Sequence, residues 1–225
     1  MRSFRSELER MLGFTVDGLN GLSRVLDVLE LEVSRGGIAR YHAMLQFLVA
    51  LDLHRRGFDV NVEEPVDGGF KADVYAEGPT GRVIVEVETG YVPPDRMYEL
   101  EGFLEAKIAF KALAYSFYTD LFVVATPSHM SLSIPEELLK PVESRSVEDV
   151  IAIRELALRY DRVKASRILW RAHASRVDGV AYVNISDRRV YYLIPLNHPS
   201  SPKAHILNCN PDNQVADGEN PLVIC

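Results

Sequence analysis

The sequence predicts an α/β fold with a mixed central sheet, and three observations support this prediction. A helical pattern is followed by three segments of strand character, and the last two flank the turn-forming sequence Gly-Pro-Thr-Gly at residues 78–81. A second helical pattern then leads into residues 121–126, which are apolar on both faces, as expected for a strand inside a sheet. The 225 residues, 47% of them hydrophobic, suffice for one such core with additions at both ends.

Residues 1–37 are expected to form an N-terminal helical extension. Apolar residues recur at helical spacing from residue 16 to residue 33, and Asp17 is a suitable N-cap for that helix. The sequence Ser-Arg-Gly-Gly at residues 34–37 then breaks the pattern. Residues 1–37 are therefore predicted to form a helical extension that precedes the core.

Residues 38–130 are expected to form the core. Its first helix should stop at Gly57, because glycine tolerates the left-handed conformation found at helix ends. A later helix should begin after the sequence Pro-Pro-Asp at residues 93–95. The predicted order is a helix at 39–56, a strand at 58–63, strands within 71–75 and 83–88, a helix at 97–118 and a strand at 121–126.

Residues 131–225 are expected to add helices, a second hairpin and a tail that pack on the core. Helical patterns cover 135–140 and 147–160, and strands at 180–185 and 189–194 flank the sequence Ser-Asp-Arg. After residue 197, Pro, Asn, Ser and Asp accumulate, which predicts loop with a strand-like patch at 222–225. Cys209 and Cys225 lack metal-ligand spacing and predict neither a zinc site nor a disulfide framework.

The predicted hairpin at residues 71–88 carries three carboxylates on otherwise apolar strands. Strand side chains alternate between faces, so Glu86 and Glu88 point to one side while the valines around them point to the other, into a core. If Gly-Pro-Thr-Gly forms the turn, Asp73 lies opposite Glu86, and Lys71 lies opposite Glu88. Carboxylates this close raise one another's pKa unless a cation sits among them, and a hard divalent ion with oxygen ligands meets that need.

A second interpretation of the hairpin stays open, in which its charges form a solvent-facing surface. Lys71 would then neutralise Glu88 across the strands, and Arg82 would pair with Glu77. Exposed ion pairs of this kind are common and contribute little. The apolar run at residues 83–87 favours a covered central strand over such a surface.

An Asp at the start of one strand and a Glu-x-Glu pair on the next, preceded by a helix, resemble the metal site of the PD-(D/E)XK nuclease superfamily. The resemblance covers roughly residues 38–127, and Ala72 stands where the motif has Pro. It implies a restriction-endonuclease-like αβββαβ core with a mixed central sheet, an N-terminal helical extension and a C-terminal α+β elaboration. It also implies that Asp73 and Glu86 hold Mg²⁺ or Mn²⁺, and that Glu88, at the position of the usual Lys, holds a second ion or accepts a proton from water. Some type II restriction enzymes of the superfamily carry the same Glu-x-Glu arrangement.

Two helices are expected to complete this site. The superfamily often places an acidic residue on the helix before the sheet, where this chain has His42 and Gln46, four residues apart and so on one face. His42 could orient a phosphate or a water, or could be a structural hydrogen-bonding residue. On the helix after the sheet, Lys107 and Lys111 lie one turn apart and could replace the missing cation. Alternatively, they form a solvated face paired with glutamates of their own helix.

The net charge of -7 argues against non-specific coating of nucleic acid, which depends on Lys and Arg. Residues 161–190 are nevertheless locally basic, and Trp170 within them could stack on a base or sugar. The alternative is a solvated helix with Trp170 in the core. The cations predicted to contact phosphates are Arg162, Lys164, Arg167 and Arg171.

These features predict a Mg²⁺- or Mn²⁺-dependent endonuclease that hydrolyses phosphodiester bonds of DNA, and superfamily members that cut two strands often pair as homodimers. Two other interpretations stay open: a catalytically inactive nuclease-fold module that binds nucleic acid or a protein partner, and an unrelated α/β scaffold with an exposed charged hairpin. No run reaches the ~18 apolar residues of a membrane span, and residues 1–7 lack a signal-peptide core, so a cytoplasmic protein is expected. The scarcity of Gln and Cys suggests a thermophilic source.

Overall fold

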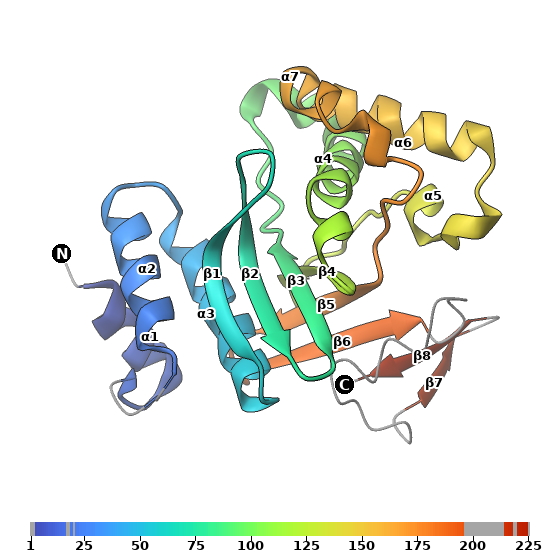
Figure 1. Ribbon diagram of the computed structural model, residues 1–225. Coiled ribbons are helices and arrows are strands. Elements are labelled where there is room, and N and C mark those ends of the chain that lie inside the picture. The colour runs from blue at the N-terminus through green and yellow to red at the C-terminus, as the bar shows by residue number, and fades with distance from the viewer. Residues whose placement is uncertain (1–2, 17–18, 20, 196–213, 218–219, 225) are drawn as a thin grey trace.

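The computed structural model describes residues 3–16, 19, 21–195, 214–217 and 220–224. Its centre is a sheet with strand order β1-β2-β3-β4-β5-β6-β8-β7 (Figure 1). β4 pairs in parallel with both β3 and β5, and the other neighbours pair antiparallel, which confirms the predicted mixed sheet. The strands are β1 (Asp59–Val66), β2 (Phe70–Gly78), β3 (Gly81–Val87), β4 (Leu121–Pro127), β5 (Gly179–Asn184), β6 (Arg189–Pro195), β7 (Gln214–Asp217) and β8 (Asn220–Ile224).

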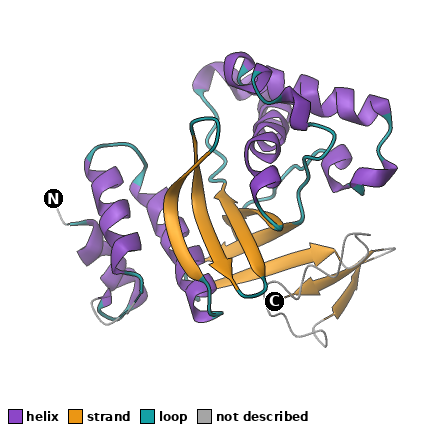
Figure 2. Ribbon diagram, viewed as in Figure 1, coloured by secondary structure: helices purple, strands orange, loops and turns teal. Residues whose placement is uncertain are grey.

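Helices cover both faces of the sheet (Figures 1 and 2). One face is covered by α1 (Phe4–Leu12), α2 (Ser23–Ser34) and α3 (Arg40–Arg55). The other face is covered by α4 (Leu100–Tyr115), α5 (Glu136–Leu139), α6 (Val147–Tyr160) and α7 (Arg162–Ser166). Short 3₁₀ turns are η2 (Pro94–Glu99), η3 (Ser116–Tyr118), η4 (Val142–Ser144) and η5 (Leu169–Arg171).

Alternation of side chains along β3 explains why two separate cores form. Val83, Val85 and Val87 join the core that includes α1 to α3, whereas Ile84 joins the core that includes α4 and α6. Every residue of β4 is buried, as expected for a strand covered on both faces. The parallel pairing of β3 with β4 requires a crossover connection, and α4 supplies it.

The N-terminal extension contains two helices, and the sequence analysis identified only the second of them. α2 begins at Ser23 rather than near residue 16, and the proposed N-cap Asp17 lies outside the described residues. α1 begins after Ser3, whose side chain accepts a hydrogen bond from the Ser6 N–H. The sequence analysis did not predict α1, because this helix buries only one apolar side chain per turn. Those side chains are Phe4, Leu8 and Leu12.

The other predicted elements are present with shifted ends. The helix predicted at 97–118 is divided into η2, α4 and η3, and the strand predicted at 58–63 extends to Val66. The predicted second hairpin is confirmed as β5 and β6. The strand-like patch at 222–225 belongs to β8, which pairs with β7, a strand that the sequence did not predict; residue 225 lies outside the described residues.

Gly57 follows α3 in a backbone conformation that favours glycine, with a φ of +91°, and a Cβ built there would meet nothing within 4 Å. Gly57→Ala is therefore expected to lower the free energy of unfolding through backbone strain alone, by about 1–2 kcal/mol. Urea unfolding followed by circular dichroism measures the change. Gly57→Asn should lower the free energy of unfolding less than Gly57→Ala does, because Asn tolerates a positive φ better than Ala. An Ala variant as stable as the wild type would contradict this explanation.

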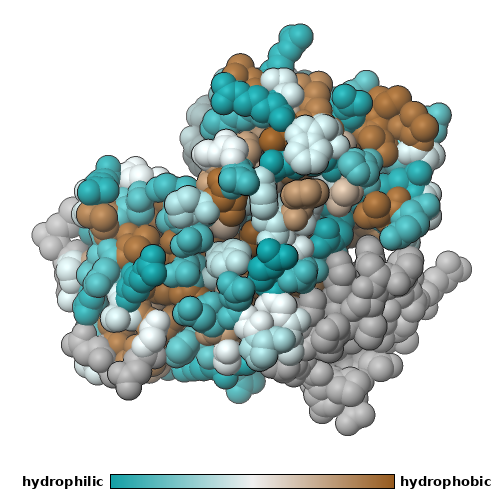
Figure 3. All heavy atoms as spheres, in the orientation of Figure 1, coloured by the Kyte–Doolittle hydropathy of each residue, from teal (hydrophilic) through white to brown (hydrophobic). Residues whose placement is uncertain are grey.

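Apolar side chains gather on the surface of α5 and α6, toward the upper right of the view in Figure 3. They include Leu139, Val147 and Ile151, which are 47%, 71% and 46% exposed.

Among the helices of the described ranges, none combines the length and the apolar character needed to cross a membrane.

Candidate active site

The hairpin of β2 and β3 has the register that the sequence predicts. Val74 pairs with Val85, and the same register places Asp73 opposite Glu86. The Asp73 N–H donates to Glu86 Oε1 at 2.9 Å, and the Val87 N–H donates to Asp73 Oδ2 at 2.7 Å. Each carboxylate is therefore held by a backbone N–H of the opposite strand.

Lys111 of α4 reaches all three carboxylates of the hairpin. Its Nζ lies 2.5 Å from Glu88 Oε1, 3.1 Å from Glu86 Oε2 and 3.6 Å from Asp73 Oδ2. The same ammonium group donates to the Val87 carbonyl oxygen at 3.3 Å. We call these four oxygens, from Asp73, Glu86, Glu88 and the Val87 carbonyl, the oxygen cage.

Lys107 lies one turn before Lys111 and contacts the second carboxylate oxygen of Glu88, with Nζ 2.6 Å from Oε2. Both lysines thus point into the site. The alternative, in which they form a solvated face paired with glutamates of α4, is wrong. Glu105 of that helix instead accepts a hydrogen bond from Ser133 Oγ at 2.8 Å.

The interpretation of the hairpin as a solvent-facing charged surface is also wrong. Glu86 and Glu88 are 2% and 3% exposed. Lys71 pairs with Glu32 at 3.2 Å, and Arg82 pairs with Asp120 at 3.4 Å. The predicted cross-strand pairs do not form, because α2 and the segment between η3 and β4 bring other acids within reach of these cations.

Burial and charge act together on Asp73 and Glu86. Burial opposes ionisation of Asp73, but Lys111, His42 and the Val87 N–H outweigh it and hold the pKa of Asp73 below its usual value. Burial, followed by repulsion from Asp73, raises the pKa of Glu86 well above its usual value in spite of Lys111. Burial and the surrounding charges thus shift the pKa values of the two neighbouring carboxylates in opposite directions.

Charge outweighs burial at Glu88 and Lys111. Burial opposes ionisation of Glu88, but Lys111 and Lys107 lower its pKa. Burial likewise opposes the charge of Lys111, but Glu88, Glu86 and then Asp73 raise its pKa well above the usual value. The ammonium of Lys111 consequently stays charged within a group of carboxylates.

α3 approaches Asp73 from the opposite face of the sheet through the two residues predicted on it. His42 Nε2 lies 3.2 Å from Asp73 Oδ1, and Gln46 Nε2 donates to the same oxygen at 3.0 Å. Gln46 Nε2 also donates to Glu63 Oε1 at 2.8 Å. These contacts orient the Asp73 carboxylate.

Glu63 is part of this arrangement, and the sequence analysis missed it. The β1–β2 pairs on either side place Glu63 opposite Asp73, and its φ of +50° is unusual for a residue other than glycine. Burial raises its pKa. The Asp-Gly-Gly sequence at residues 67–69 was the available signal, because counting outward from a three-residue turn there brings Glu63 to Asp73.

The oxygen cage has the chemistry of a hard-cation site, since carboxylate and carbonyl oxygens are the ligands that Mg²⁺ and Mn²⁺ prefer. Gln46 Oε1 is a further buried oxygen, without a hydrogen-bond partner. Within the part of the chain that the structure describes, however, no group of three or more His, Cys, Asp or Glu residues is arranged to hold a metal ion. Lys111 balances the charge of the cage, and metal binding by Asp73, Glu86 and Glu88 stays a prediction.

The residues predicted to contact nucleic acid separate into two groups. Arg171 is 7% exposed and donates to the Ala114 carbonyl at 3.3 Å and to the Tyr118 hydroxyl at 2.5 Å. Its guanidinium is buried beside the last turn of α4, so its predicted phosphate contact is wrong. Trp170 is 57% exposed, so its alternative place in the core is also wrong. The remaining three are exposed: Arg162, Lys164 and Arg167.

Comparisons with protein-family models, with curated proteins and with solved structures found no match to this chain. The function is therefore inferred from the residues and geometry of the site itself.

Proposed function

We propose that this chain is a metal-dependent deoxyribonuclease with a restriction-endonuclease-like core, a Glu-x-Glu variant of the PD-(D/E)XK type. The observation that carries the proposal is the convergence of the Asp73, Glu86 and Glu88 carboxylates around Lys111. The element order α3-β1-β2-β3-α4-β4 supports it, because this is the αβββαβ order that the resemblance implies.

The roles of the residues follow from their contacts. Asp73 and Glu86 would hold Mg²⁺ or Mn²⁺, which when bound polarises the scissile phosphate and lowers the pKa of a bound water. Lys111 supplies from α4 the positive charge that the motif places at the position of Glu88, and its ammonium stabilises charge that develops on the phosphate. Glu88 orients the ammonium groups of Lys107 and Lys111.

His42 and Gln46 act in this proposal as positioning residues. Both contact Asp73 Oδ1, and so they fix the direction in which the carboxylate points. Glu63, which accepts from the Gln46 amide, sets the orientation of that amide and leaves its Oε1 toward the interior.

Asp73→Asn and Glu86→Gln are each expected to lower Mn²⁺-dependent cleavage of DNA at least about 100-fold, because each neutral side chain removes charge needed to stabilise the transition state. Release of fluorescent fragments from labelled linear, nicked, forked and four-way DNA measures the rate. Glu77→Gln is the matched control, since Glu77 is an exposed acid on β2, the strand that carries Asp73. If both site variants cleave at the wild-type rate while Glu77→Gln is also unaffected, the nuclease proposal is wrong.

One observation favours a second candidate, a catalytically inactive module that binds nucleic acid or a protein partner. Lys107 and Lys111 already balance the carboxylates of the site without a metal ion. Calorimetric titration with Mn²⁺ separates the candidates: heat of binding that is lost in Glu86→Gln supports the nuclease, and no binding at millimolar Mn²⁺ supports the inactive module.

A further inference from the structure

A groove of about 500 Å³ opens beside the oxygen cage. Its walls come from the start of β2, the segment before α4, α4 itself and the junction of α6 with α7. Lys111 lines both the groove and the cage. A ligand in this groove would therefore lie directly beside the candidate catalytic residues.

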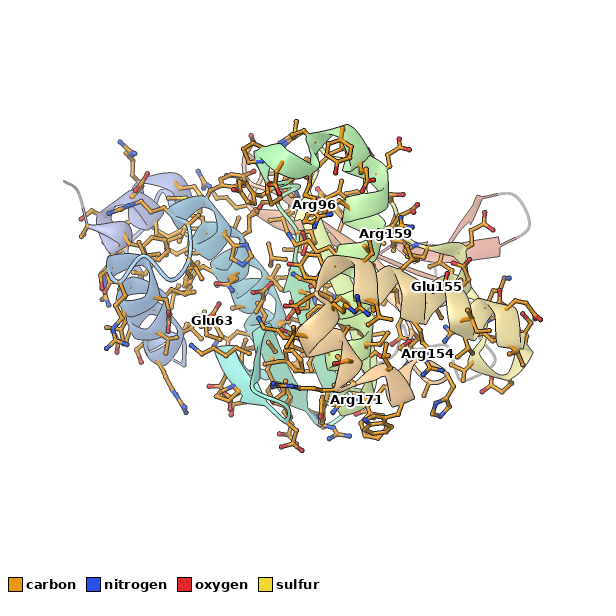
Figure 4. The ribbon with its side chains drawn as sticks, turned by 90° about the horizontal axis from the view of Figure 1, so that it is seen from above. Glu63, Arg96, Arg154, Glu155, Arg159 and Arg171 are labelled. Atoms are coloured by element: carbon orange, nitrogen blue, oxygen red, sulfur yellow. The ribbon has the colours of Figure 1, made fainter. Side chains whose placement is uncertain are left out.

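Three exposed cations line the groove in addition to Lys111. The side chains of Lys71, Arg96 and Lys164 are 50%, 42% and 63% exposed. Each has an acidic neighbour, at 3.2 Å for Lys71 and at 3.9 and 3.8 Å for the other two. Exposed pairs of this kind contribute little, so a phosphate can replace the acid as the partner. Figure 4 shows Arg96 on the segment that precedes α4.

Aromatic rings form the apolar wall between these cations. Phe103 and Phe110 of α4 pack on Tyr160 with ring centroids 5.5 and 5.2 Å apart, and Phe70 packs on Phe110 and Tyr115. All five residues line the groove. Rings between cations are the arrangement by which proteins bind unpaired bases, because every base offers a face for stacking while the cations follow the phosphates.

The segment that enters the groove wall also presents aromatic side chains to solvent. Tyr91 is 67% exposed and Tyr98 is 78% exposed, on either side in sequence of the groove-lining residues Pro93 and Arg96. Aromatic side chains of this kind can stack on bases. The segment that lines the groove thus offers two further rings to solvent near the groove-lining residues in sequence.

We propose that this groove binds a single-stranded segment of DNA, with phosphates on Lys71, Arg96 and Lys164 and a base against the aromatic wall. The inference rests on the proposed nuclease function and names its substrate class. A single strand fits because the site is recessed: the side chains of Lys111 and Asp73 are 14% and 15% exposed. An unpaired strand can bend its backbone toward them and offer its bases to the rings, whereas a duplex keeps its bases stacked inside.

The test measures binding separately from cleavage. Fluorescence anisotropy of a labelled 15-nucleotide oligothymidylate, in EDTA so that no divalent ion is present, is compared with a blunt duplex of the same length. We expect the wild type to bind the single strand at least about tenfold more tightly than the duplex. The double variant R96A/K164A should bind more weakly, and its slope of log affinity against log salt should fall by about 0.7 for each cation removed.

Phe103→Leu tests the stacking contact and should weaken binding of the single strand about fivefold or more, because leucine keeps an apolar side chain but removes the ring. Arg154→Ala is the matched control, an exposed arginine on α6 that does not line the groove, and it should bind as the wild type does. Melting temperatures of all variants show whether they remain folded.

Three results would overturn the inference: duplex binding as tight as single-strand binding, no single-strand binding by the folded wild type, or R96A/K164A and Phe103→Leu variants that both bind normally. Single-strand binding without Mn²⁺-dependent cleavage would reject the nuclease proposal and leave the groove as a binding site. Cleavage of duplex DNA alone would support the nuclease proposal and reject the groove as a binding site for single strands.

Discussion

Lys111→Met is expected to lower the free energy of unfolding by about 3–5 kcal/mol in metal-free buffer, because it leaves buried carboxylates without their shared cation. Lys111 Nζ lies within 3.6 Å of Asp73, Glu86 and Glu88, and all four side chains are largely buried. Methionine fills a similar volume, so the loss reports charge rather than a cavity. Guanidinium unfolding followed by circular dichroism measures it.

Lys107→Met is the matched control for this prediction. Lys107 pairs with Glu88, which keeps its contact with Lys111 in the variant, and we expect a smaller loss of about 1.5–3 kcal/mol. Addition of Mn²⁺ or Mg²⁺ should restore part of the stability of Lys111→Met if a divalent ion can enter the oxygen cage. A Lys111→Met protein as stable as the wild type would mean that the three carboxylates do not depend on this ammonium.

Asp178→Ala is expected to lower the free energy of unfolding by a similar amount, about 3–5 kcal/mol, since it removes the acidic partner of a buried pair. Asp178 is 3% exposed, and its Oδ2 accepts from the Phe122 N–H at 2.8 Å. Its Oδ1 accepts from Arg176 Nε at 2.9 Å. The carboxylate thus joins β4 to the segment before β5, and alanine would leave the Phe122 N–H without this acceptor.

Asp178→Asn separates the hydrogen bond from the charge. Its carbonyl oxygen can still accept from the Phe122 N–H, so we expect a loss smaller than that of Asp178→Ala. Asp187→Ala, at an exposed turn residue, should change stability by no more than about 0.5 kcal/mol. Thermal unfolding of the three variants gives the comparison, and equal losses in the Ala and Asn variants of Asp178 would show that charge alone matters there.

The register of the acidic hairpin could be predicted because it depends on neighbouring residues. The Gly-Pro-Thr-Gly turn sets which residues face each other, and the two-residue period of strands places Glu86 and Glu88 on one face. The same counting from the three-residue Asp-Gly-Gly turn between β1 and β2 would have added Glu63.

The breadth of the apolar stripe explains why α3 was predicted and α1 was not. α3 buries side chains along most of its length, so its period stands out, whereas α1 presents one apolar residue per turn between polar and charged ones. Arg171 shows the limit for charged residues. The basic composition of residues 161–190 suggests that Arg171 contacts a phosphate. Packing of η5 against α4 instead places its guanidinium beside the Ala114 carbonyl.

The sequence by itself determined the mixed α/β architecture and the acidic hairpin, because periodicity and turn chemistry act over a few residues. The candidate residues His42, Gln46, Lys107 and Lys111 came from helical spacing together with the resemblance to the nuclease superfamily. Only the tertiary structure decided what the carboxylates contact. Lys111 follows Glu86 by 25 positions and meets it because α4 crosses over the sheet between β3 and β4, and the groove forms because α6 and α7 then pack beside α4. Contacts of this kind depend on how buried surfaces fit together across the whole chain, which local patterns do not encode.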